Sequence, residues 1–265
     1  FGDPHIDSEL FDKERFDKEI ARQIKDMNSY CIFVGDITED DRPSTRQRRK
    51  DMHSDREEAL SLDDKKHMLW MDQKIVPIFK KIAPRCLGML DGDHYRRYGS
   101  GITSTQYICM RTGIPYLGER MAAVRLRLSP KRNTKSNYTG CVRTYDILVT
   151  HGAGSASTPG GDLNNLLKKL IGFADYDLVL SGHTHKCLSF QQPIQGVSKS
   201  GELVDRMFTV ARCGTFLKSY KANKQGYAEY SEYTPLKTGC ARIHLHFAKD
   251  GPTALWRISD IKCEI

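Results

Sequence analysis

The chain has 265 residues, of which 39% are hydrophobic, and this is enough to bury the core of one large α/β domain or two smaller ones. No apolar run approaches the roughly 20 residues that a membrane helix needs, so the sequence excludes an integral helical membrane protein and we expect no membrane partner. The formal net charge is +8, and the basic residues gather in clusters, which favours an anionic partner.

Short apolar runs recur along the chain, and each ends at a residue type that can bind a metal ion. Residues 31–34 lead into Gly35-Asp36, 86–90 into Asp91-Gly92-Asp93-His94, 147–150 into His151, and 178–180 into Ser181-Gly182-His183. Runs of this length bounded by glycine and aspartate are typical of buried strands. Because open α/β folds place their active sites at the carboxyl ends of strands, these residues predict a site at one sheet edge.

A further fragment of the same kind, Asp3-Pro4-His5, lies close to the start of the sequence. Only Phe1 and Gly2 precede it, which is too little for a strand. We therefore expect the natural chain to begin further upstream.

Two segments have the periodicity of helices. Residues 55–83 carry a loose apolar stripe between charged residues, and Pro77 should kink or end the helix there. Residues 162–174 place leucines on one face. The second helix lies between the runs that end at His151 and His183, so we expect a strand–helix–strand crossover with parallel strands.

The remainder of the chain is rich in predicted strands, at 123–128, 187–190, 207–211, 240–247 and 254–259. His244 and His246 alternate within one of them and point to the same sheet face. We interpret this pair as structural. Periodicity alone supports the α/β class and nothing finer.

The fragments D-x-H, G-D, G-D-H, H and G-H-T-H, in that order, resemble the signature of the calcineurin-like metallophosphoesterase superfamily. The resemblance runs from Asp3 to His185, and Gly182-His183-Thr184-His185 is its most specific part. It implies two packed mixed β-sheets flanked by helices, the four-layer metallophosphoesterase sandwich. It also implies that residues 1–265 form a single metallophosphoesterase domain.

The resemblance implies a role for each residue of the motifs. The first of two divalent metal ions would be held by Asp3, His5 and His185, and the second by Asp93, His151 and His183. Asp36 would bridge both ions through its two oxygens. His94 would be catalytic and face the substrate. The family has asparagine where this chain has Asp93. The added negative charge should tighten cation binding and lessen the attraction for a phosphate anion. Manganese is the expected metal, with iron, zinc, nickel and magnesium as alternatives.

Such a centre would hydrolyse phosphoester bonds. Two cations about 3.5–4 Å apart would lower the pKa of a bridging water, and the resulting hydroxide would attack phosphorus. His94 would protonate the leaving oxygen or hold a phosphate oxygen.

Basic residues follow two of the predicted ligands closely. Arg46, Arg48 and Arg49 come after Asp36, and Arg96 and Arg97 come after His94. They predict binding of a substrate with several phosphates, such as DNA, RNA or a nucleotide. The alternative is that they are solvated loop residues.

The leading hypothesis is therefore a phosphodiesterase or nuclease. The alternatives are a phosphomonoesterase acting on a small molecule or a protein, and a non-catalytic interaction module with the same fold. The eight cysteines form no C-x-x-C pair and several lie in apolar runs, so we expect free thiols and a cytoplasmic location. The sequence indicates no oligomeric state.

Overall fold

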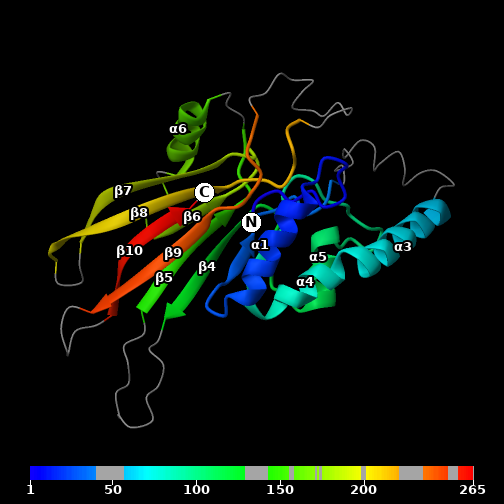
Figure 1. Cartoon of the computed structure of the whole chain (residues 1–265), viewed down its shortest axis with the longest axis horizontal. Coiled ribbons are helices and arrows are strands. Elements are labelled where there is room, and N and C mark those ends of the chain that lie inside the picture. The colour runs from blue at the N-terminus through cyan, green and yellow to red at the C-terminus, as the bar shows by residue number, and fades with distance from the viewer. Residues whose placement is uncertain are drawn as a thin grey trace, which may run out of the picture.

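The computed structural model describes residues 1–39, 57–128, 143–154, 158–170, 172, 175–197, 201–220, 235–249 and 256–264. Helices and strands alternate through the first part of the chain, and long strands dominate the rest (Figure 1). The fold is mixed α/β, which confirms the predicted class.

A small parallel sheet contains the first two predicted strands. Its order is β1 (Cys31–Phe33), β2 (Cys86–Leu90), β3 (Tyr116–Gly118). The side chains of β1 alternate between two hydrophobic clusters, with Phe33 in one and Ile32 in the other. Both faces of the sheet are therefore buried, as the uninterrupted apolar runs predict.

Helices cover one face of this small sheet. They are α1 (Lys13–Lys25), α3 (Glu57–Lys74), α4 (Val76–Ile82) and α5 (Ser104–Thr112), with a short 3₁₀ helix at Ala83–Arg85. Phe16, Met71 and Phe79 pack with Phe33 in one cluster. The predicted helix over 55–83 is divided at Ile75, and Pro77 lies in the first turn of α4, where a missing N–H costs nothing.

A larger mixed sheet forms the other side of the molecule. It contains β4 (Met121–Leu128), β5 (Arg143–Thr150), β6 (Leu178–Ser181), β8 (Leu203–Cys213) and β7 (Cys187–Val197), in that spatial order. Strands β5, β6 and β8 are parallel, while β4 and β7 pair antiparallel at the edges. β9 (Arg242–Lys249) and β10 (Trp256–Glu264) pair separately as an antiparallel ribbon.

Helix α6 (Pro159–Leu170) connects β5 to β6. It begins before the predicted 162–174, and the end of that range includes residues outside the described part of the chain. Its Leu166 packs against Val179 and Phe208 of the large sheet. The predicted parallel crossover is confirmed, because β5 and β6 pair in parallel.

The two sheets pack against each other through a shared cluster. Ile32 and Leu90 of the small sheet meet Val149, Leu180 and their neighbours from the large one. The small sheet differs from the mixed sheet expected, because helical connections between β1, β2 and β3 return the chain in the same direction. The cysteines at positions 31, 86, 109, 187, 213 and 240 are free thiols. Among the described helices, none is both long enough and apolar enough to cross a membrane.

Candidate metal centre

The predicted metal ligands lie together in the structure. Asp36, Asp93, His151 and His183 follow β1, β2, β5 and β6, and Asp3 and His5 come from the N-terminal segment that pairs beside β1. The Asp36 N–H donates to the carbonyl of Asp91 at 2.9 Å, and the His5 N–H donates to the carbonyl of Asp36 at 3.0 Å. Backbone hydrogen bonds therefore join the ligand-bearing loops to one another.

The predicted ligands of the second metal ion, Asp93, His151 and His183, form a group that could hold a metal ion. One oxygen of Asp93, Oδ2, lies 3.4 Å from Nε2 of His151 and 3.0 Å from Nδ1 of His183. The ligand atoms of these residues all lie within 4.8 Å of one another. His151 and His183, followed by a nearby arginine, hold the pKa of Asp93 well below its usual range, so it stays ionised.

Asp3, His5 and His185, the predicted ligands of the first metal ion, also lie close together. Nε2 of His5 lies 3.3 Å from Nε2 of His185, which in turn lies 3.7 Å from Oδ2 of Asp3. Burial and the neighbouring His5 lower the pKa of His185 to about 3, so its ring is neutral and has a lone pair to offer. Burial raises the pKa of Asp3 to about 6, since this carboxylate is fully removed from solvent.

Asp36 lies between the two positions. Its Oδ1 accepts the backbone N–H groups of Asp93 and His94, at 2.6 and 2.9 Å. Its Oδ2 lies 3.3 Å from Nε2 of His151 and 3.9 Å from Nε2 of His5. The expected bridging role of Asp36 stays a prediction: Oδ2 faces both groups of candidate ligands, and Oδ1 accepts the two backbone N–H groups.

His151 has the most constrained orientation of these residues. Its Nδ1 lies 3.0 Å from the carbonyl oxygen of Val34, and because a carbonyl only accepts, Nδ1 carries the proton. Nε2 is therefore the ring nitrogen left for a metal ion or a second proton, and it is buried and faces the carboxylates of Asp36 and Asp93. Burial would lower the pKa of His151, but the two carboxylates outweigh it and raise the pKa to about 10. The site thus favours a positive charge at this point.

The backbone is strained at the candidate ligands. Among the described residues, the non-glycine positions with positive φ are Asp3 (26°), His5 (46°), Asp36 (50°), His183 (72°) and His185 (59°). Each such conformation costs about 1–3 kcal/mol and persists where the surrounding structure enforces it, typically at functional sites. All of these strained residues belong to the predicted ligand set.

Glycines allow the ligand loops to approach closely. A Cβ placed on Gly35 would lie 2.6 Å from Nδ1 of His151 and 2.7 Å from the Cα of Gly92. A side chain at Gly35 would therefore separate the loop that carries Asp36 from the loop that carries Asp93.

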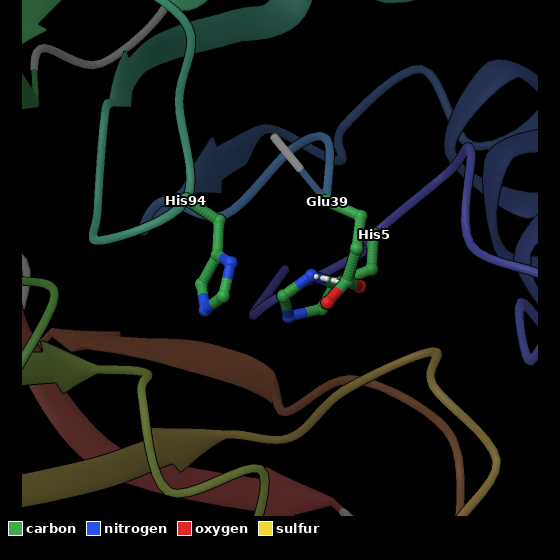
Figure 2. Close-up of side chains that lie close together, drawn as sticks. All are labelled: His5, Glu39 and His94. Atoms are coloured by element: carbon green, nitrogen blue, oxygen red, sulfur yellow. Dashed lines mark ion pairs between the residues drawn. The ribbon is translucent and has the colours of Figure 1, made fainter. Parts of the chain in front are cut away.

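His94 and Glu39 lie beside the first metal position. Figure 2 shows the two side chains with His5, and the Glu39 carboxylate lies against the His5 ring. Oε2 of Glu39 is 2.9 Å from Nδ1 of His5, and the Glu39 N–H donates to Asp7 at 2.6 Å. A carboxylate at the far nitrogen of a ligating histidine fixes the tautomer and leaves Nε2 for the metal. Sequence reasoning did not assign Glu39 a role, although its position three residues after Asp36 was a signal.

Replacing Glu39 with alanine is expected to weaken binding at the first metal position by roughly tenfold or more, because His5 loses the partner that orients it. Calorimetric titration of manganese into the chelator-treated protein measures this effect. Glu14→Ala on α1 is the matched control, since Glu14 is exposed and pairs with the exposed Lys18 at 2.7 Å. Equal affinities in the two variants would remove Glu39 from the centre.

The predicted substrate-binding arginines are only partly described. Arg46, Arg48 and Arg49 lie outside the described residues. Arg96 pairs with Asp63 and Asp64, at 2.9 Å for the latter. Arg97 pairs with Glu119 at 2.7 Å. The charges of Arg96 and Arg97 are therefore engaged by carboxylates in the structure.

Two further arginines, neither assigned a role from sequence, contact the ligand loops. Arg120 forms an ion pair with Asp93 and donates to the carbonyl of Gly152 at 2.6 Å. Arg212 is buried, pairs with Asp162 at 2.9 Å, and donates to the carbonyl of Gly182 at 2.8 Å. Both partners are distant in sequence, so no local pattern indicates these contacts.

Comparison with known proteins adds no relative: no family model matches the chain, and no curated protein matches it. Any functional proposal for this chain therefore rests on its motifs and on the geometry of the site.

Proposed function

We propose that this protein is a metal-dependent phosphoesterase of the calcineurin-like metallophosphoesterase superfamily. The observation that supports this most directly is the environment of His151. Its buried Nε2 lies 3.3 and 3.4 Å from carboxylate oxygens of Asp36 and Asp93. These carboxylates raise the pKa of the ring, so they favour a positive charge at this point, which a divalent cation would supply.

The donor set fits two divalent cations. Imidazole nitrogens and carboxylate oxygens in this mixture suit manganese, iron or zinc better than calcium. Oδ1 of Asp3 and Nε2 of His151 are buried polar atoms without hydrogen-bond partners, as expected of atoms that coordinate a metal ion. When bound, two such cations supply an activated water and neutralise charge on a phosphoryl group.

The packing of the elements is consistent with the proposed four-layer sandwich. One cluster joins the helices to the small sheet through Phe33, a second joins the two sheets through Ile32, and a third joins α6 to the large sheet through Leu166. This order of helices, sheet, sheet and helix is the one that the superfamily resemblance implies.

The residues around the cations have separable tasks. Asp36 links the two positions through Oδ2 and holds the loop of His94 through Oδ1. His94 directs a ring toward the same space as His5, with the ring centroids 5.2 Å apart. Its Nδ1 is buried without a hydrogen-bond partner, so the ring is available to hold a phosphate oxygen or to protonate the leaving oxygen.

Within this class we favour a phosphodiesterase or nuclease acting on nucleic acid or nucleotides. The basic cluster Arg46, Arg48 and Arg49 after Asp36 supports an extended anionic substrate. A phosphomonoesterase is the second candidate, favoured by the engagement of Arg96 and Arg97 with carboxylates. An interaction module is less well supported, because the histidines of every motif are present.

Hydrolysis of bis-p-nitrophenyl phosphate and p-nitrophenyl phosphate in manganese tests the proposal. We expect two metal ions per chain, cleavage of the diester in preference to the monoester, and loss of both activities with a chelator. Preference for the monoester would move the assignment to a phosphatase. A chain that binds no metal stoichiometrically would contradict the phosphoesterase proposal itself.

A further inference from the structure

Arg120 occupies an unusual place beside the second metal position. It lies in the short connection between β3 and β4, and its guanidinium joins the carboxylate of Asp93 to the carbonyl of Gly152. Its own carbonyl accepts the N–H of His151 at 2.8 Å. One residue thus contacts the loop after β2 and the loop after β5, and each of these loops carries a ligand.

The two oxygens of Asp93 have different partners. Oδ1 accepts from Arg120, whereas Oδ2 faces His151 and His183 at 3.4 and 3.0 Å. The guanidinium therefore fixes the rotation of the carboxylate and leaves only Oδ2 for a cation. Arginine suits this task because its planar fork also reaches the carbonyl of Gly152.

Arg120 also changes the charge balance of the candidate metal centre. Asp3, Asp36 and Asp93 are its carboxylates, and within the described residues Arg120 is the one lysine or arginine that forms an ion pair with any of them. A cationic side chain against Asp93 cancels the charge that this carboxylate adds, so the pair acts on an incoming cation much as a neutral ligand would.

We propose that Arg120 is a positioning residue that sets the cation affinity of the Asp93–His151–His183 position, by acting as the counter-charge of Asp93. This inference rests on the proposed function, because it treats that position as a metal site. The alternative is that Arg120 and Asp93 form a partly exposed ion pair that has little effect on metal affinity, since their side chains are 40% and 30% exposed. The second contact, to Gly152, and the position of Asp93 Oδ2 against His151 and His183 favour the positioning role.

Manganese titrated into the chelator-treated full chain, followed by calorimetry, tests the inference without measuring activity. Arg120→Gln should tighten binding at the second position by roughly tenfold, and Asp93→Asn should weaken it by a similar factor. The double variant should return close to the wild-type affinity, because both charges are gone. Arg120→Lys, which keeps the charge, should stay within a few-fold of wild type and serves if Arg120→Gln does not fold.

Arg125→Gln is the matched control, because Arg125 pairs with Asp146 at 2.7 Å on the exposed part of β4 and contacts no candidate ligand. The inference is overturned if Arg120→Gln behaves like this control, or if the double variant binds as weakly as Asp93→Asn alone. Failure of the proposed function has a different signature, since the wild-type chain would then bind no stoichiometric manganese.

Discussion

Replacing His94 with glutamine is expected to lower diester hydrolysis by a factor of about 10²–10⁴ while both metal ions remain bound, because a general acid typically contributes that much. In the structure, the backbone of His94 contacts a candidate metal ligand, whereas its ring is free to act on the substrate. The backbone N–H of His94 donates to Asp36 at 2.9 Å, and this contact does not depend on the side chain. The ring itself has a buried Nδ1 without a hydrogen-bond partner. Turnover and metal content, measured on the same preparations, check both halves of the prediction.

A series of diesters with increasingly poor leaving groups sharpens this test. The loss in His94→Gln should grow as the leaving group becomes more basic, because such groups need a proton in the transition state. His67→Gln is a matched control, since His67 lies on α3 and bonds to Tyr98 at 2.8 Å. A constant loss across the series would assign His94 to phosphate binding, and no loss would remove it from the mechanism.

The grouping of the candidate ligands was predictable from sequence because four of them follow a local pattern. A buried apolar strand followed by glycine and a polar residue is visible in one dimension, and the structure confirms the strands that precede Asp36, Asp93, His151 and His183. Parallel pairing of β1 with β2 and of β5 with β6 then brings their carboxyl ends together. The position of the helix break near Pro77 was predictable for the same reason, since it follows from local chemistry.

Two helices missed from sequence had local signals as well. Asp12 caps α1 by accepting the N–H of Arg15, and Phe16 and Ile20 follow on one buried face. Thr103 and Gln106 form a reciprocal capping box at the start of α5. The spacing of Phe16 and Ile20 also marks one apolar face of α1, whereas the apolar residues of α5 are not confined to one face and its capping box is the clearer signal.

Contacts made across the fold were beyond sequence reasoning. Arg120 and Arg212 contact Asp93 and Asp162 through tertiary packing, and no local pattern in the sequence links these pairs. The same limit applies to Arg96, because charge clustering in a sequence does not show that Asp63 and Asp64 lie within reach of its guanidinium. The orientation of the Asp36 carboxylate likewise depends on a backbone donor from a loop far along the chain.

The buried pair of Arg212 and Asp162 leads to the largest expected effect on stability. Both side chains are about 2% exposed. Replacing Arg212 with methionine should destabilise the fold by about 3–5 kcal/mol, because it leaves the carboxylate of Asp162 buried and without its countercharge. Thermal or denaturant unfolding of the metal-free protein measures the loss.

The expected effect extends to the metal centre, because Arg212 also holds the turn before His183. It donates to Oγ of Ser181 and to the carbonyl of Gly182, both at 2.8 Å. Arg212→Met should therefore lower metal occupancy as well as stability. The exposed pair of Arg111 and Asp72, joined at 2.8 Å, gives the matched control, and Arg111→Met should cost about 0–1 kcal/mol.

A double variant, Arg212→Met with Asp162→Leu, distinguishes a buried charge from lost packing. Removing both charges should recover much of the stability lost in the single variant, since no uncompensated carboxylate remains. Metal occupancy should stay low in the double variant, because methionine cannot donate to the carbonyl of Gly182. Recovery of occupancy together with stability would mean that the turn carrying His183 and His185 holds its shape without Arg212. The strain at those two histidines, with φ of 72° and 59°, would then have to be maintained by other contacts, such as the 2.7 Å hydrogen bond from the His183 N–H to Asp3.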